Sequence, residues 1–468
     1  MIHKNFVKVE KVGSFDPLFY DYVEELKAFE DENHWYMPKF FDKTNFCQKY
    51  FQGKIVSLPK LKEYKDQFEN KLKCRYELKP YQIPVVKRLL NLFKKQNYLN
   101  GIVQLSTGFG KTFLSLYLAN ELKLKTIIVV DTSVLFNQWI ERILEYFPEL
   151  SENDIGKIKG KEYFVPKSAP FTVCFVQTLN AKLRNMDNTF FRKIAKENFG
   201  LVIFDEVHKL SASKKYAKIS SMFDTKNVIG LSATPYKYGV QKVLLESSVG
   251  KVIISKQNFS YKPKILLVRY KSNLKDFVSR QNFWKTKYMG KLEKVKAMSM
   301  YSSLILDSPK YIRLISSIAK VLNKLNHKTI IIASTIKQCD TLSKHIENSC
   351  SYHSKNKNVN LNEFDVIVGT YKSCSHGFDK KDLSAVVFAV PFSGKVSIPQ
   401  IVGRILREYE GKKEPVVVYL IDDDFPYLFN VIKAVNVLKQ EYGDCKVELL
   451  DFAKDFSNIE MKLENTLK

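Results

Sequence analysis

The sequence has no stretch that could carry the chain across a membrane or direct it to a secretory route. No apolar run approaches the roughly 20 residues that a membrane-spanning helix needs. The N-terminus, Met-Ile-His-Lys-Asn-Phe, has neither an apolar signal region nor an Arg-rich amphipathic transit pattern. We therefore predict an intracellular, cytoplasmic protein with no membrane partner.

Cysteine is scarce, and its spacing argues against two classes of structural site. The seven cysteines are scattered and odd in number, and none of them forms a Cys-x-x-Cys pair. Neither a zinc site nor a disulfide framework is therefore predicted, and we expect buried or idle thiols in a reducing compartment.

Acidic residues are the minority charge. The chain has 75 Lys and Arg against 49 Asp and Glu, a formal net charge of +26. Such an excess suits a polyanionic partner, most simply nucleic acid, although solubility in a lysine-rich proteome would also explain it. With 468 residues, of which 45% are hydrophobic, the chain is long enough for two or three globular domains.

One glycine is missing from an otherwise complete phosphate-binding pattern. The apolar run 102–105 predicts a buried strand, and the apolar spacing that starts at Phe113 predicts a helix. Leu105 stands where the full pattern has its first glycine. In the turn between strand and helix, glycines let backbone N–H groups face a phosphate, Lys111 can reach the outer phosphates, and Thr112 can ligate magnesium. The predicted nucleotide-binding residues of this turn are Thr107, Gly108, Phe109, Gly110, Lys111 and Thr112.

Two adjacent carboxylates follow a second buried strand. The apolar residues 201–204 lead directly into Asp205 and Glu206. Ligands of open parallel sheets bind at the carboxyl ends of the strands, so this position suits a nucleotide site. We expect Asp205 to hold Mg²⁺ through water, and Glu206 to orient and deprotonate the water that attacks ATP.

The order of the motifs resembles that of superfamily 2 helicases. Thr-Gly-x-Gly-Lys-Thr at 107–112 is followed by Asp-Glu-x-His at 205–208 and Ser-Ala-Thr at 232–234, and a segment ending at Gln82 resembles the preceding Q motif. These forms and the compact length are most similar to the transcript-release helicases of poxviruses and other large cytoplasmic DNA viruses. The phage and bacterial branch-migrating helicases are similar too. The resemblance covers roughly residues 75–425.

The resemblance implies roles for residues outside the phosphate turn. Gln82 would read the adenine edge with the donor and acceptor atoms of its amide. The residues that would couple hydrolysis to nucleic acid are His208, Ser232, Thr234 and Gln400. The residues that would contact the nucleic-acid backbone are Thr132, Thr178 and Thr370. A helix N-cap would explain Thr178 as well, and Trp139 is expected in the core rather than stacked on a base.

In the second half of the chain the resemblance implies a further nucleotide contact and an arginine motif. Asp379 would face ATP, although lysines follow it where the family usually has a proline. The segment 400–407 resembles the arginine-finger motif of the family. Arg404 and Arg407 are three residues apart and would share one helical face, directed at the γ-phosphate across an interdomain cleft. A surface arginine pair that forms salt bridges is the alternative.

The predicted fold class is α/β, with two tandem RecA-like domains that contain parallel sheets and a small N-terminal accessory segment. The predicted parts are the accessory segment 1–72, the first RecA-like ATP-binding domain 73–255, a basic linker or insertion 256–300, the second RecA-like domain 301–425 and a C-terminal tail 426–468. The aromatic residues of the accessory segment either form its core or, with its lysines, bind nucleic acid. The basic stretch 271–296 is either a solvated helical face or a nucleic-acid-facing insertion.

The sequence thus predicts an ATP-dependent helicase or translocase that acts as a monomeric motor. It would hydrolyse ATP with Mg²⁺ between the two domains and move along or unwind DNA or RNA. The viral resemblance adds transcription termination or transcript release, partners from the transcription or replication machinery, and the virion as a second location. One alternative is a nucleic-acid-stimulated ATPase that remodels protein–nucleic acid complexes or branched DNA without processive unwinding. Another is a motor domain kept only as a scaffold, against which the intact phosphate turn, carboxylates and arginines argue.

Overall fold

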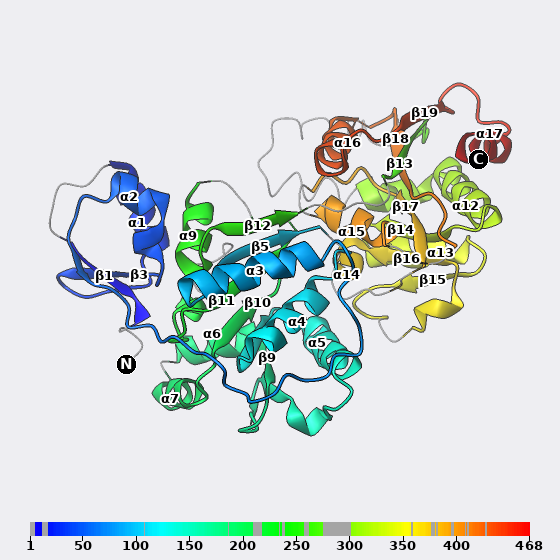
Figure 1. Cartoon of the computed structure of the whole chain (residues 1–468). Coiled ribbons are helices and arrows are strands. Elements are labelled where there is room, and N and C mark those ends of the chain that lie inside the picture. Colours follow the sequence, from blue (N-terminus) through cyan, green and yellow to red (C-terminus); the bar gives the residue numbers. More distant parts are fainter. Residues whose placement is uncertain are drawn as a thin grey trace. The chain divides into compact units, whose positions relative to one another are not determined.

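The computed structural model of the chain contains two compact units, Met1–Asn258 and Phe259–Lys468 (Figure 1). The structure describes residues 5–11, 17–106, 108–185, 187–208, 218–233, 235, 239–256, 262–274, 301–356, 359–375, 380, 382–394, 397–407, 409, 411–425 and 428–468. Within these ranges, no helix combines the length and the apolar character that crossing a bilayer requires.

The first unit begins with a small antiparallel sheet whose strands lie in the order β2-β3-β1-β4. Its elements are β1 (Val7–Glu10), α1 (Pro17–Leu26), β2 (Phe29–Glu30), β3 (His34–Met37), the 3-10 helix η2 (Phe41–Lys43), α2 (Asn45–Tyr50) and β4 (Ile55–Ser57). Trp35, Phe41 and Phe46 are buried in its core, where Leu244 of the main body joins them. The interpretation of these aromatics as a core is therefore confirmed, and they are not placed to stack on bases.

The chain then runs as an extended strap, residues 58–76, across the main body of the first unit. The Gln67 side chain accepts a hydrogen bond from Lys125 N at 2.9 Å and donates to Asn198 O at 2.8 Å. The amide of Asn120 holds both backbone groups of Leu72, at 2.8 and 2.9 Å. The strap therefore binds Lys125 and Asn198, which precede strands of the main sheet, and Asn120, which lies near the end of a helix.

Two lysines of the strap pair with carboxylates of the same unit. Lys62 lies 3.0 Å from Asp224, and Lys71 lies 2.6 Å from Glu121. These contacts explain part of the basic character of the segment without a nucleic-acid partner.

The main sheet of the first unit has eight strands in the order β12-β5-β11-β10-β6-β9-β7-β8. The strands are β5 (Asn100–Leu105), β6 (Thr126–Val130), β7 (Gly156–Lys159), β8 (Glu162–Phe164), β9 (Phe171–Phe175), β10 (Leu201–Phe204), β11 (Val228–Ser232) and β12 (Val252–Lys256). Neighbours pair in parallel except for β7 and β8. All five residues of β6 are buried, as expected for a strand that is covered on both faces.

Helices cover both faces of this sheet. They are α3 (Ile83–Gln96), α4 (Lys111–Leu122), α5 (Ser133–Tyr146), the 3-10 helix η3 (Glu152–Asp154), α6 (Val176–Arg184), α7 (Asn188–Lys196) and α9 (Val240–Val249). One core joins α3, α4 and α5 to the sheet, and a second core joins α6, α7 and α9 to the other face. The carboxyl ends of β5, β10 and β11 therefore meet at one edge, which we call the carboxyl edge; the opposite, amino edge lies under the strap.

The second unit has a seven-stranded parallel sheet in the order β15-β16-β14-β17-β18-β13-β19. Its strands are β13 (Lys264–Tyr270), β14 (Lys328–Ala333), β15 (Ser349–Tyr352), β16 (Val366–Thr370), β17 (Leu383–Phe388), β18 (Val416–Asp422) and β19 (Val447–Asp451). Its helices are η6 (Ile305–Asp307), α12 (Pro309–Lys324), α13 (Ile336–Lys344), η7 (Leu361–Glu363), α14 (Tyr371–Ser375), α15 (Ser397–Ile405), α16 (Leu428–Tyr442) and α17 (Ile459–Leu467). One core contains α12, α13 and α17, and the core on the other face contains α15 and α16. The predicted α/β class with two parallel sheets is confirmed.

Two predicted connecting segments take part in this second sheet. β13 falls within the predicted linker 256–300, yet it pairs with β18 and β19. β19 and α17 fall within the predicted tail 426–468, and α17 packs on the same core as α12. Residues 275–300, which hold most of the predicted basic insertion, lie outside the described residues.

Candidate active site

The phosphate turn joins the end of β5 to the start of α4. Gly108 and Gly110 have φ angles of 86° and 83°, a left-handed conformation that favours glycine. Gly110 caps α4, so the first backbone N–H groups of this helix are available at the turn. The Phe109 ring is buried and packs edge to face on Tyr81, with 5.0 Å between ring centroids, so Phe109 offers a ligand only its backbone. Thr107 lies outside the described residues.

Lys111 and Thr112 are the first two residues of α4. Lys111 Nζ donates to the carbonyl oxygens of Leu105 and Ser106, at 3.1 and 3.2 Å. These bonds hold the ammonium group at the carboxyl end of β5. Phosphate oxygens are stronger acceptors than neutral carbonyls, so the ammonium group of Lys111 can exchange these carbonyls for the phosphates of a bound nucleotide.

Gln82 fixes the turn from the side of α3. Its Nε2 donates to Phe109 O at 2.8 Å, and its Oε1 accepts from Lys79 N at 3.0 Å. A Cβ at Gly110 would lie 2.5 Å from Gln82 Nε2, so the contact requires glycine there. The structure thus assigns the Gln82 amide to backbone contacts, and its reading of adenine stays a prediction.

Asp205 and Glu206 follow β10 at the carboxyl edge. Asp205 Oδ2 accepts from the indole Nε1 of Trp139 at 2.9 Å, and Oδ1 accepts from Glu206 N at 2.9 Å. Burial and the neighbouring Glu206 charge raise the pKa of Asp205 to about 6, while the Trp139 hydrogen bond and the charge of Lys111 act in the opposite direction. Glu206 has a φ of 49°, a costly conformation for a residue with a side chain.

The Asp-Glu-x-His and Ser-Ala-Thr segments are in direct contact. His208 Nδ1 lies 3.0 Å from Ser232 Oγ and 3.2 Å from Glu206 Oε2, and both His208 and Ser232 are buried. A Cβ at Gly230 would lie 2.6 Å from Val207 Cγ2, so glycine permits the close packing behind this contact. Thr234 lies outside the described residues.

The two predicted backbone-contacting threonines of the first unit differ in their surroundings. Thr132 is the N-cap of α5 and accepts from Leu135 N at 3.2 Å, and its side chain is half-buried. Thr178 lies inside α6, is buried, and accepts from Gly160 N at 2.7 Å. The structure therefore supports neither the phosphate contact nor the N-cap interpretation of Thr178, because its oxygen is engaged within the fold.

In the second unit, Thr370 is the last residue of β16. Its hydroxyl donates to Ser373 Oγ at 3.0 Å. The backbone contact of Thr370 stays a prediction, and Asp379 lies outside the described residues.

The arginine motif spans the end of α15. Gln400, which is buried, and Arg404 lie four residues apart on this helix. The helix ends at Ile405, so Arg407 follows it. The prediction that Arg404 and Arg407 share a helical face is therefore wrong, although their part in ATP turnover stays a prediction.

Comparison with known proteins matches residues 75–237 to the family described as "Type III restriction enzyme, res subunit". The chain is 26% identical over 419 residues to "Putative ATP-dependent RNA helicase L396" of Acanthamoeba polyphaga mimivirus, covering 83% of this chain and 75% of that protein. It is 25% identical over 402 residues to "Transcript termination protein A18" of Yaba-like disease virus, covering 79% of each chain.

Over about four fifths of its length, the chain is therefore similar to proteins of helicase superfamily 2. It is therefore an ATP hydrolase of the helicase class, with ATP and nucleic acid as its ligands. The fold agrees: the solved structure "S. cerevisiae Dbp5 bound to RNA and ADP BeF3" aligns with a TM-score of 0.55 at 14% identity, over 84% of this chain and 98% of that one.

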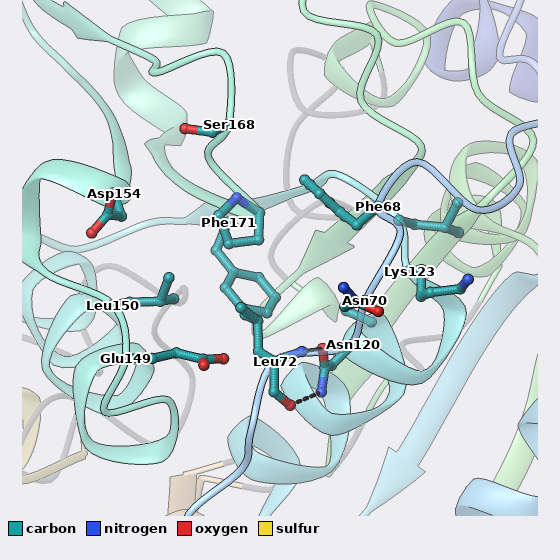
Figure 2. A pocket seen from close by; sticks show the side chains of 13 residues that line it. Phe68, Asn70, Leu72, Asn120, Lys123, Glu149, Leu150, Asp154, Ser168 and Phe171 are labelled. Atoms are coloured by element: carbon teal, nitrogen blue, oxygen red, sulfur yellow. Dashed lines mark hydrogen bonds between the residues drawn. The ribbon is translucent and has the colours of Figure 1, made fainter.

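The protein also has a cavity of about 360 Å³ at the amino edge of its first sheet. Figure 2 shows the cavity beside the bond between Asn120 and Leu72 of the strap. Phe171 and Leu150 supply apolar walls. One polar residue of the lining, Glu149, accepts a hydrogen bond from a backbone N–H of the strap at 2.7 Å. The cavity is thus a space between strap and main body, far from the phosphate turn along the strands.

The sequence did not indicate the contact between Trp139 and Asp205. Trp139 was expected in the core, and it is indeed 2% exposed, but its polar atom bonds a predicted catalytic-site carboxylate. The two residues are 66 positions apart, and no local pattern joins them. The one signal in the sequence is a tryptophan at a core position, because a buried indole N–H needs a hydrogen-bond acceptor.

Proposed function

We propose that the chain is a magnesium-dependent, ATP-driven translocase that moves along nucleic acid by gripping its backbone. The observation that carries this proposal is the 3.0 Å contact between His208 and Ser232. It joins the strand that ends in the hydrolytic carboxylates to the strand that ends in the Ser-Ala-Thr segment. A motor needs such a link, because hydrolysis must change the grip on the strand.

In this proposal Lys111 and the N-terminus of α4 bind the outer phosphates of ATP. Glu206 accepts a proton from the attacking water, for which a carboxylate placed within hydrogen-bond reach is suited. Arg404 and Arg407 of the second unit stabilise the charge that develops on the transferred phosphoryl group. Gln82 holds the phosphate turn in shape through its 2.8 Å bond to Phe109 O.

Asp205 fits a magnesium ion. Its carboxylate is a hard oxygen donor, and burial beside Glu206 raises its pKa to about 6, as expected where a cation would relieve the repulsion. Thr112 adds a hydroxyl donor. When bound, magnesium would neutralise negative charge on the phosphates of ATP. Asp205 would hold the ion through water, while Lys111 and the turn hold the nucleotide.

The nucleic acid is expected to be bound through phosphates rather than base edges. The formal net charge of +26 supports this, as does the position of Thr132 at the N-cap of a helix that begins at the carboxyl edge. Affinity should therefore fall steeply as salt rises and depend little on base sequence.

We assign the motor to transcript release or transcription termination. The support is the similarity to the Yaba-like disease virus protein named for transcript termination. The alternative is an ATPase that remodels protein–nucleic acid complexes without processive unwinding. A 225-residue match at 32% identity to a protein named "DNA 3'-5' translocase XPB2", covering 48% of this chain and 46% of that one, favours translocation over strand separation as the shared activity.

The test measures ATP turnover with single-stranded DNA, duplex DNA, branched DNA and RNA at one salt concentration, beside strand displacement with the same substrates. The proposal expects stimulation by at least one polymer. Ser232→Ala should reduce this stimulation and strand movement much more than unstimulated turnover. Turnover that no nucleic acid stimulates would refute the motor, and equal loss of both activities in Ser232→Ala would refute the coupling role.

A further inference from the structure

Trp139 is a core residue whose polar atom contacts the candidate magnesium ligand. The side chain is 2% exposed and lies on α5, within the core that joins α3, α4 and α5 to the sheet. Its Nε1–H donates to Asp205 Oδ2 at 2.9 Å. A phenylalanine could fill most of this space but could not donate the hydrogen bond.

The carboxylate of Asp205 is held at both oxygens. Oδ2 accepts from Trp139, and Oδ1 accepts from the backbone N–H of Glu206, also at 2.9 Å. Two donors on opposite oxygens fix the rotation of the carboxylate, and each oxygen keeps a lone pair for a further ligand. Mutation of a residue that orients a metal ligand typically lowers metal affinity or activity by roughly 10- to 100-fold.

Helix α5 connects Trp139 to the predicted nucleic-acid contact at the start of the helix. Thr132 caps α5, and Trp139 lies two turns further along the same helix. The predicted nucleic-acid contact and the carboxylate partner therefore belong to one rigid element. A displacement of α5 by the nucleic-acid strand would act directly on the Asp205 carboxylate.

We propose that Trp139 is a positioning residue that orients Asp205 for magnesium through its indole N–H. This inference rests on the proposed function, in which Asp205 holds magnesium. It assigns to Trp139 a role in metal-dependent nucleotide binding that core packing alone would not give.

The experiment compares Trp139→Phe with the parent chain. The affinity for a fluorescent, non-hydrolysable ATP analogue is measured in EDTA and in Mg²⁺, and the ratio of the two dissociation constants gives the gain due to the metal. Trp139→Phe should leave the affinity in EDTA unchanged, because the phosphate turn is intact, and should lower the metal-dependent gain about tenfold. Trp35→Phe is the matched control, since Trp35 is a buried tryptophan (8% exposed) in the small N-terminal sheet.

An unchanged gain in Trp139→Phe would overturn the inference and leave the proposed function intact. A parent chain that gains nothing from Mg²⁺ would overturn the assignment of Asp205 as well. A second measurement does not require altering Trp139: in the full chain with Trp35→Phe and Trp284→Phe, Trp139 is the remaining tryptophan. Its emission should change when the nucleotide binds with Mg²⁺ and change much less in EDTA. Equal emission under both conditions would refute the contact's role.

Discussion

At the carboxyl edge of the first sheet, charged and hydroxyl side chains contact one another, whereas at the amino edge the strap covers the strand ends with backbone hydrogen bonds. His208 contacts both Ser232 and Glu206 at the carboxyl edge. At the amino edge, Gln67 and Asn120 bind main-chain groups on either side of the strap. Strand β10 thus begins beside the strap and ends in the two carboxylates of the candidate site.

The carboxyl edge also holds groups in unfavourable states. Glu206 has a φ of 49°, and Asp205 has a pKa raised to about 6 by burial and the adjacent carboxylate. Strain and like charges of this kind are kept where a function requires them, and bonds elsewhere in the fold must offset their cost. Changes at the carboxyl edge should therefore alter turnover, and changes at the amino edge should alter stability.

The largest effect is expected for Lys111→Ala. Loss of the ammonium removes the main charge that meets the outer phosphates, so ATP turnover should fall by roughly 10³-fold or more while nucleic-acid binding largely remains. The matched control is Lys71→Ala on the strap, whose partner Glu121 lies near the other end of α4. A phosphate-release assay measures the turnover of both variants. Turnover at the parent rate in Lys111→Ala would show that the phosphate turn is not the ATP site.

The substitution Glu206→Gln should have the next largest effect on ATP turnover. Glutamine keeps the shape but cannot take up the proton, so turnover should fall by roughly 10²–10⁴-fold while ATP still binds. Nucleotide binding by fluorescence and turnover by phosphate release separate these two effects. Joint loss of binding and turnover would instead indicate a structural role, given the φ of 49° at this residue.

Asn120→Ala tests the amino edge. The substitution removes both hydrogen bonds to Leu72 of the strap, so the free energy of unfolding should fall by about 2 kcal/mol. Turnover per folded molecule should stay at the parent value. Asn70→Ala is the control, since Asn70 is exposed at the same cavity. Urea unfolding gives the free energy of unfolding, and an ATPase assay gives the turnover. A large loss of turnover in Asn120→Ala would contradict the inference that the amino edge serves stability alone.

A buried lysine at the amino edge should make the stability of the chain depend on pH. Lys39 Nζ donates to Phe223 O and Thr225 O, both at 3.2 Å, and burial lowers its pKa to about 7. Because the unfolded chain then binds more protons above pH 7, the free energy of unfolding should rise with pH, by up to about 1.4 kcal/mol per unit between pH 7 and 9. Lys39→Met should lack this rise.

The control for this pH effect is Lys62→Met. A hydrogen bond from Lys62 to Asp224 raises the pKa of this lysine, so it titrates above the same pH window. Urea unfolding of the parent and both variants at pH 7, 8 and 9 measures the slopes. Parallel slopes for the parent and Lys39→Met would contradict the assignment.

Much of the fold was predictable because its signals are local. The apolar runs 102–105 and 201–204, which the sequence predicts as buried strands, lie in β5 and β10. The glycines of the phosphate turn adopt the positive φ angles that their residue type allows. Arg404 and Arg407 do not share a helical face because α15 ends at Ile405, and the sequence marks this helix end poorly.

By itself, the sequence determined the parallel α/β class and the residues around which the nucleotide site is built, because strand and helix periods, glycine turns and adjacent carboxylates are properties of neighbours along the chain. Tertiary structure alone decided which side chains meet. Trp139 bonds Asp205 across 66 residues, and Asn120 binds the strap across 48. It also decided that Thr178 is turned inward and that β19 completes the second sheet. These outcomes depend on the burial of polar atoms, which must find partners wherever the packed chain brings them.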